Sequence, residues 1–227
     1  MPPPLSEQRV VVLLGGAGSG KTEIALALAL RWAEAFERVH LVDFDFVTPY
    51  FRSQDVRAEL GQAGVTVVAS PPEYAGIDVP VLPQEIAAVV ADPRNRVLFD
   101  VGGDPIGATT LGQFRPLLQQ AQAAVYLVLN GRRPGAREAI EVARLADQMS
   151  AASRLGFDGV IANSNLGPET TPEVVAQGVD LAQEVAAQLG VPLALVCCLE
   201  PLADQVSRHT TAPVLPVKVQ LRLPWNV

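Results

Sequence analysis

The chain of 227 residues has little cysteine and no long apolar run. Its only cysteines, Cys197 and Cys198, are adjacent and lie in an apolar segment, so we expect two reduced, buried thiols. The absence of C-x-x-C argues against a cysteine-ligated zinc or iron–sulfur site within one chain. No apolar run approaches the roughly 20 residues of a membrane span. Residues 1–8 lack the parts of a signal peptide, so we expect a cytoplasmic protein without a membrane segment.

Positive charge is also scarce. The chain has 17 Lys and Arg residues against 24 Asp and Glu residues, a formal net charge of −7. This balance argues against non-specific binding of nucleic acid, which depends on a basic surface. The hydrophobic fraction of 49% suits a single domain over residues 1–227 with a sizeable core. The proline-rich residues 1–8 are expected to form a flexible arm.

What the sequence does contain is a phosphate-binding loop. The stretch Gly15-Gly16-Ala17-Gly18-Ser19-Gly20-Lys21-Thr22 matches G-x-x-x-x-G-K-[ST], between an apolar strand over residues 9–14 and a helix over residues 23–36. In such a loop, backbone N–H groups and the start of the helix bind phosphate. We expect Lys21 to contact the β- and γ-phosphates of a bound nucleotide and the Thr22 hydroxyl to be a ligand of Mg²⁺.

Strand and helix patterns alternate along the rest of the chain. Further strands are expected over residues 39–42, 65–69, 96–100, 123–129, 157–162, 192–198 and 214–223, and further helices over 53–62, 84–91, 108–120, 136–153 and 172–189. The alternation predicts an α/β fold, a three-layer P-loop NTPase with a mostly parallel central sheet and helices on both faces. The proline-rich residues 70–83 are expected to form a loop that could act as a lid.

Carboxylates follow two of the expected strands. Asp43 and Asp45 follow residues 39–42, and Asp100 ends an apolar strand in the Walker B pattern. Such residues could hold Mg²⁺ and position water for attack on a phosphate. Asp43 and Asp45 could instead cap the following turn. Asp104 could support the metal site or cap a helix.

In this order, and with Asn163 after a late strand, the motifs resemble the MinD/ParA/CooC family of SIMIBI-class P-loop ATPases over nearly the whole chain. The resemblance implies that the cofactors are ATP and Mg²⁺. It also implies that Asp43 supports the metal, that Asp45 orients the attacking water, and that Asp100 is the Walker B ligand.

The same resemblance implies contacts with both ends of the nucleotide. The N–H of Gly103 would sense the γ-phosphate, Asn163 would read the adenine edge, and Glu200 and Pro201 would pack against the adenine. The segments 45–52, 100–104 and 163–167 look like those of bacterial MinD-like ATP-binding proteins of undefined role. No Asn-Lys-x-Asp motif for guanine occurs, which favours ATP over GTP.

The chain departs from the family at three points. Gly16 stands where many members have a lysine that crosses a dimer interface to the partner's phosphates. No cysteine follows Asp100 where the nitrogenase iron protein has a cluster ligand, and the basic amphipathic tail of MinD is absent. The candidates for the missing positive charge are Arg52, Arg115, Arg132 and Arg133, although each alone could be an ordinary solvated arginine.

Two functions of different classes therefore stay open. The first is a slow ATPase that acts as a nucleotide switch on an unknown protein partner or in metal or cofactor delivery, with a nucleotide-linked homodimer as one form. The alternative is a small-molecule phosphotransferase, because carboxylates after the second strand also resemble those of shikimate-type kinases. A regulator that binds nucleotide without hydrolysis is a third interpretation.

Overall fold

A computed structural model describes residues 3–45, 54–69, 84–103 and 105–218. Several expectations fall outside these ranges, namely those for Arg52, for the 70–83 segment and for Asp104. Within the ranges, no helix combines the length and the apolar character that a membrane crossing requires.

The described strands form one sheet in the order β3-β2-β4-β1-β5-β6-β7-β8. Every neighbouring pair in it is parallel, as the alternation of strands and helices predicts. The strands are β1 (Val10–Leu14), β2 (Val39–Phe44), β3 (Val65–Ala69), β4 (Arg96–Val101), β5 (Ala124–Leu129), β6 (Gly159–Ala162), β7 (Leu193–Leu199) and β8 (Val214–Val217). The expected edge strand in the tail is therefore confirmed for its first residues.

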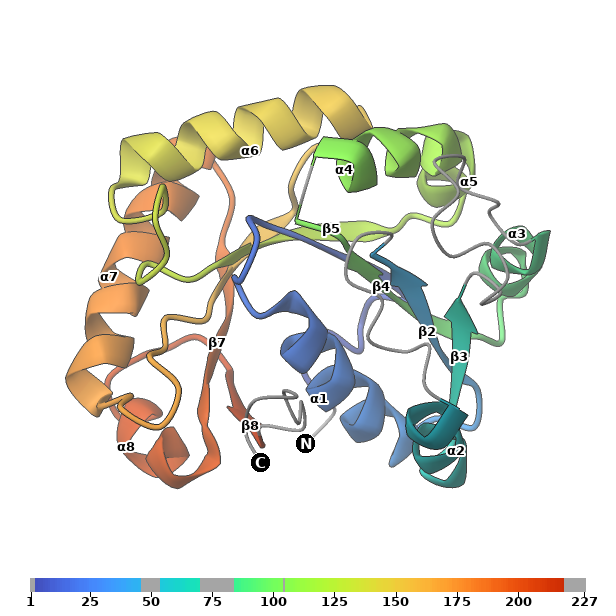
Figure 1. The fold of residues 1–227 in the computed structure, drawn as a ribbon, viewed down its shortest axis with the longest axis horizontal. Coiled ribbons are helices and arrows are strands. Elements are labelled where there is room, and N and C mark those ends of the chain that lie inside the picture. Colours follow the sequence, from blue (N-terminus) through green and yellow to red (C-terminus); the bar gives the residue numbers. More distant parts are fainter. Residues whose placement is uncertain (1–2, 46–53, 70–83, 104, 219–227) are drawn as a thin grey trace.

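Helices cover both faces of the sheet (Figure 1). One face carries α3 (Gln84–Ala91), α4 (Pro105–Leu111), α5 (Arg115–Gln120), α6 (Ala139–Ser153) and α7 (Pro172–Leu189), while the other carries α1 (Lys21–Ala33) and α2 (Gln54–Gln62). The short elements are the 3₁₀ turns η2 (Gly112–Phe114) and η3 (Glu200–Leu202) and the helix α8 (Ala203–Val206). The predicted three-layer fold is confirmed.

The central strand β1 shows how the two cores form. Val10, Val12 and Leu14 pack into the core under α3–α7, while Val11 and Leu13 pack into the core under α1. All five side chains are buried because a parallel strand covered by helices on both sides has no solvent face. This explains why β1 is a continuous apolar run rather than an alternating one.

Residues 3–8, for which a flexible arm is expected, pack against the domain in the structure. Leu5 is buried, and the Trp32 indole N–H donates to the Pro4 carbonyl at 2.9 Å. Arg96 donates to the carbonyls of Ser6 (2.7 Å) and Gln8 (3.1 Å). The buried indole and the Arg96 side chain need acceptors, and the N-terminal segment supplies them.

The helix expected over residues 108–120 is broken into α4, η2 and α5. The break is at Gly112, where an added Cβ would lie 3.0 Å from the Ala152 carbonyl oxygen of α6. Pro116 is in the first turn of α5, where its missing N–H costs no helical hydrogen bond. Close packing against α6 and a proline suited to a first helical turn thus coincide with the break.

The carboxyl ends of the strands bring the expected site residues to one edge of the sheet. Asp100 pairs in register with Asp43 on one side and with Leu13, just before the phosphate-binding loop, on the other. Asn163 directly follows β6, two strands beyond β1. Ligands of open α/β sheets bind at this edge.

Candidate nucleotide-binding site

The loop between β1 and α1 has the shape of a phosphate cradle. Gly18 and Gly20 adopt φ angles of +71° and +91°, in the left-handed region that favours glycine. Lys21 begins α1, and its ammonium donates to the carbonyls of Gly15 (2.9 Å) and Gly16 (3.1 Å). The buried charge is therefore held across the mouth of the loop, where a phosphate group would meet it.

A carboxylate and a hydroxyl lie together beside this loop. Asp100 is only 2% exposed, and burial raises its pKa to about 6, while a side-chain hydrogen bond with Thr22 and the nearby Lys21 charge both lower that pKa. The Asp45 charge raises the pKa of Asp100 further, which places these two carboxylates in one electrostatic environment. A buried carboxylate paired with a hydroxyl fits Mg²⁺, which prefers oxygen ligands and binds through few protein groups plus substrate phosphates.

Asp43 is also buried, at the end of β2. Its Oδ1 accepts a hydrogen bond from the backbone N–H of Asp45 at 3.2 Å. This bond closes a local turn just after the strand. The sequence allowed either a turn cap or a metal-supporting carboxylate, and Asp43 does form the turn contact.

Gly103 lies against the phosphate-binding loop. A Cβ added there would lie 2.6 Å from the backbone nitrogen of Ala17 and 2.7 Å from its Cα. No side chain fits such a gap, so the approach requires glycine at this position. The segment after β4 therefore contacts the tip of the loop, as a γ-phosphate sensor would need to do.

Asn163 contacts the loop from the other side. Its side-chain Nδ2 donates to the Ser19 carbonyl at 2.8 Å, and the residue is buried. A Cβ at Gly20 would lie 2.2 Å from this Nδ2, so the contact needs glycine at position 20. This bond uses one N–H of the amino group, which leaves the second N–H and the Oδ1 acceptor for a ligand.

Sequence reasoning missed Asn130, which follows β5 and is 1% exposed. Its Oδ1 accepts from the backbone N–H groups of Arg132 (3.0 Å) and Asn165 (3.3 Å). Ser164 Oγ accepts from the Gly131 N–H at 2.9 Å. These bonds join the loops after β5 and β6. The usable signal was an asparagine at the end of a buried strand, the same pattern that identifies Asn163.

The three arginine candidates in the described part of the chain differ in their hydrogen-bond partners and exposure. The Arg133 Nε donates to the Gly18 carbonyl at 2.9 Å and so contacts the phosphate-binding loop. The Arg132 side chain donates instead to Gln177 on α7, and Arg115 is exposed at the start of α5. Of these three described candidates, Arg133 is the one with a hydrogen bond to the loop.

Glu200 and Pro201 form the 3₁₀ turn after β7, as a loop at this edge of the sheet. The Glu200 carboxylate lies 3.5 Å from the ammonium of Lys218, and both side chains are largely exposed. The structure describes no hydrogen bond between these two residues and the phosphate-binding loop. Their packing against adenine stays a prediction.

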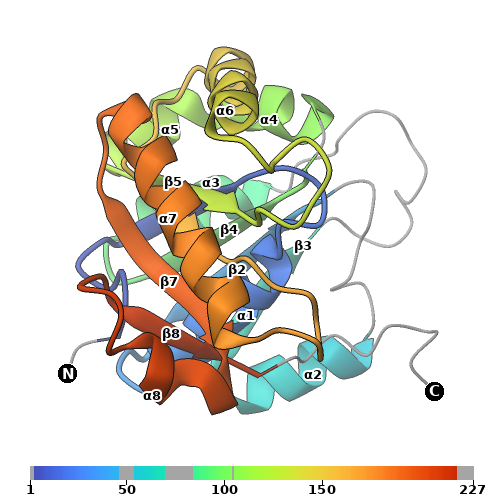
Figure 2. The same cartoon turned by 90° about the vertical axis from the view of Figure 1, so that its left-hand side faces the viewer.

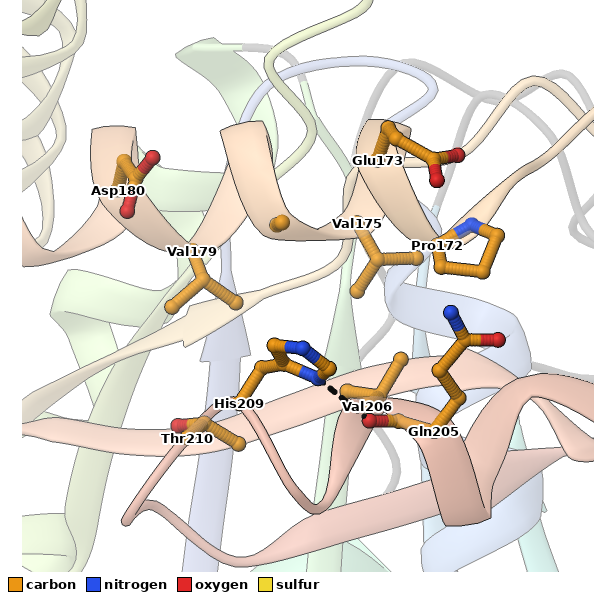
Figure 3. A pocket seen from close by; sticks show the side chains of 10 residues that line it. Pro172, Glu173, Val175, Val179, Asp180, Gln205, Val206, His209 and Thr210 are labelled. Atoms are coloured by element: carbon orange, nitrogen blue, oxygen red, sulfur yellow. Dashed lines mark hydrogen bonds between the residues drawn. The ribbon is translucent and has the colours of Figure 1, made fainter.

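Two cavities lie near these loops. One, of about 150 Å³, lies between the phosphate-binding loop and α6 and is lined by Gly16, Ser19, Asn130 and Leu145, among others. The other, of about 180 Å³, lies between α7 and α8, with Val175 and Val179 above the His209 ring (Figure 3). Figure 2 shows these two helices next to each other. None of the residues that line the second cavity belongs to the phosphate-binding loop.

The two cysteines are buried free thiols, as expected. Burial raises the pKa of both, that of Cys198 to about 11. Among the described residues, no group of three or more His, Cys, Asp or Glu side chains could hold a metal ion. A magnesium site here would therefore combine Thr22 and Asp100 with nucleotide phosphates.

No protein-family model matches the chain, and no curated protein sequence matches it. Solved structures that it resembles include the signal recognition particle 54 kDa protein of Aeropyrum pernix in complex with GDP (TM-score 0.53, 19% identity, 84% of this chain and 41% of that one). Another is the chloroplast FtsY of Physcomitrella patens (TM-score 0.56, 20% identity, 83% of this chain and 58% of that one). A third is FtsY of Elizabethkingia anophelis in complex with GDP (TM-score 0.50, 20% identity, 83% and 57%).

This likeness shows a shared fold, the three-layer α/β fold of P-loop NTPases. Membership of the SIMIBI class stays a prediction. The chain spans less than two thirds of the length of each of these structures. The narrower resemblance to MinD, ParA and CooC stays a prediction.

Proposed function

We propose that this protein binds Mg-ATP in the Gly15–Thr22 loop, hydrolyses it slowly and acts as a nucleotide switch. The observation that carries the proposal is the pairing of Thr22 with buried Asp100 beside the Lys21 ammonium. A phosphate-binding cation and two oxygen ligands for a metal thus converge at one point. A merely glycine-rich turn would have no reason to bury a carboxylate there.

Each residue has a stated part in this proposal. The loop N–H groups and Lys21 bind the β- and γ-phosphates, and Thr22 and Asp100 hold Mg²⁺ with Asp43 in support. The metal neutralises phosphate charge when bound. Asp45 orients the attacking water, and Gly103, already against the loop tip, follows the γ-phosphate.

ATP is proposed rather than GTP, although two of the solved structures hold GDP. We propose that Asn163, whose amino group donates one hydrogen bond to Ser19, presents Oδ1 to the base as an acceptor. Adenine offers an exocyclic N–H donor on its edge, whereas guanine offers an O6 acceptor at the equivalent position. The run Asn163-Ser164-Asn165-Leu166 also lacks the acidic residue of a guanine motif.

The switch itself would act through the segments after β2 and β4. Contacts with the γ-phosphate would order them, and hydrolysis would release them to change the affinity for a protein partner or a delivered metal or cofactor. Because Gly16 cannot supply a cation to a second subunit, a nucleotide-linked homodimer would have to form without that contact. The solved structures give no support to the phosphotransferase alternative.

The test is phosphate release from Mg-ATP over a range of protein concentrations. We expect slow turnover that falls at least about 100-fold in Lys21→Ala, because the main phosphate-binding cation is lost. Arg31→Ala is the matched control, since Arg31 is an exposed cation that pairs with Glu34 at the end of α1 away from the loop. Turnover per molecule that rises with concentration indicates a homodimer. Rapid turnover only after a small acceptor is added would overturn the switch in favour of a phosphotransferase.

A further inference from the structure

Two consecutive carbonyl groups of the phosphate-binding loop are each bound by a side chain from a distant loop. The Gly18 carbonyl accepts from Arg133 Nε at 2.9 Å, and the Ser19 carbonyl accepts from Asn163 Nδ2 at 2.8 Å. Arg133 follows β5 and Asn163 follows β6, so these adjacent strands place both side chains along the same stretch of the loop.

The direction of these bonds decides which part of a nucleotide the side chains could meet. In a phosphate-binding loop the N–H groups point toward the phosphates, and the carbonyls of the same peptide units point away. By this geometry the Gly18 and Ser19 carbonyls face away from the phosphates, whereas Lys21 reaches across the mouth of the loop to the Gly15 and Gly16 carbonyls and stays beside them. Arg133 in this position is a neighbour of Asn163 rather than of the Thr22–Asp100 pair.

The guanidinium of Arg133 also packs closely on the loop. A Cβ at Gly18 would lie 3.0 Å from Arg133 Nε and 3.3 Å from Cζ. The backbone below it is fixed, because the Arg133 N–H donates to the Asn130 carbonyl at 3.1 Å and its carbonyl accepts from Ala136 at 3.2 Å. Asn130 is itself buried and joins this loop to the one that carries Asn163.

Arg133 keeps most of its binding capacity for a ligand. The residue is exposed, and within the described ranges it forms no ion pair, so its charge is not neutralised by a carboxylate there. Only Nε is engaged, which leaves the flat face of the guanidinium and its two terminal amino groups. A planar cation of this kind stacks on nucleic-acid bases.

We infer that Arg133 lines the nucleoside-binding site and that its guanidinium stacks on the base whose edge Asn163 reads. The inference rests on the proposed function, since it needs a nucleotide in the loop. Arg133 then adds affinity for any nucleoside triphosphate, because every base has a face on which it can stack, while Asn163 selects the base. Arg133 is a binding residue in this scheme, and it does not act on the phosphate that is transferred.

The test compares nucleotides with a ligand that has no base. Dissociation constants are measured by competition against a fluorescent ATP analogue for Mg-ATP, Mg-GTP and Mg-tripolyphosphate. In Arg133→Ala we expect affinity for ATP and GTP to fall by a similar factor, about tenfold, and affinity for tripolyphosphate to change less than about twofold. Arg133→Lys should recover only part of the loss, because it keeps the charge and not the planar group.

Arg132→Ala is the control, because the adjacent arginine is directed to Gln177 instead of the loop. Equal losses for ATP and tripolyphosphate in Arg133→Ala would overturn the inference and make Arg133 a phosphate contact or a support of the loop. Unchanged ATP affinity would overturn it as well. In either case the wild-type protein still binds Mg-ATP and the proposed function stands, whereas failure of the wild-type protein to bind Mg-ATP refutes both.

Discussion

The two ends of the candidate site are built in different ways. The phosphate end comes from consecutive residues, Gly15–Thr22, with carboxylates from the two strands on one side of β1. The base end depends on side chains that reach the loop from 115 and 144 residues away, Arg133 and Asn163. In the proposed function, phosphate recognition therefore depends on local backbone shape and base recognition on long-range packing.

This difference has a functional consequence that experiments can address. Substitutions at the phosphate end should weaken the binding of every ligand that carries phosphates, with or without a base. Damage to the base end should affect nucleotides and spare inorganic tripolyphosphate. Gly20 belongs to both ends, because it shapes the loop and leaves room for Asn163.

The largest effect is expected from Asp100→Asn, at the phosphate end. The substitution keeps the shape of the side chain and removes the charge that a metal needs, so Mg-ATP turnover should fall roughly 100-fold. Phosphate release over a magnesium titration measures this effect. Asp147→Asn, on the exposed side of α6, is the control and should behave as the wild type. Turnover within threefold of the wild type in Asp100→Asn would remove this residue from the metal site.

Gly20→Ala should impair both ends at once. The left-handed backbone at φ +91° disfavours alanine, and its Cβ would lie 2.2 Å from the Asn163 amino group. We expect the free energy of unfolding to fall by about 2 kcal/mol, with weaker binding of ATP and tripolyphosphate alike. Thermal and denaturant unfolding measure the first effect and competition binding the second.

Gly61→Ala is a matched control for that substitution. Gly61 is an exposed position in α2 with no atom within 4 Å of an added Cβ. Alanine should stabilise the helix there by about 0.5–1 kcal/mol. If Gly20→Ala and Gly61→Ala had equal free energies of unfolding, the positive φ and the close approach of Asn163 at position 20 would not destabilise alanine there.

The smallest and most selective effect is expected from Asn163→Ala. Loss of the Oδ1 acceptor should lower ATP affinity about tenfold and reduce the preference for ATP over GTP. Tripolyphosphate binding should change little, in contrast to Lys21→Ala, which should weaken both ligands. An unchanged ratio of ATP to GTP affinity in Asn163→Ala would show that this residue supports the loop without reading the base.

Much of the fold was predictable because its signals are local. The bounds of β3, α3 and α7 agree with the expected ranges, since glycine or proline punctuates the chain beside them or an apolar run ends there. The N-terminal segment and the break at Gly112 were not predictable in this way. Both depend on partners distant in sequence, the indole of Trp32 in one case and the carbonyl of Ala152 in the other.

The candidate site divides along the same line. Lys21, Thr22 and Asp100 were identified by motif and do lie together. Asn130 was missed, although it stands at the end of a buried strand as Asn163 does. Arg133 could not be separated from the other arginines, because neither residue type nor spacing shows which side chain reaches a given carbonyl. That information appears only when β5 and β6 are placed beside β1.

The amino-acid sequence alone therefore determined the alternation of strands and helices, the phosphate-binding loop and the carboxylates at the strand ends. These depend on periodicity, on glycine's backbone freedom and on residues close together in the chain. Only the tertiary structure determined that Asn163 and Arg133 bind adjacent loop carbonyls and that Gly103 contacts the loop tip. Such contacts arise from strand order and from the space between backbones, which no local pattern encodes.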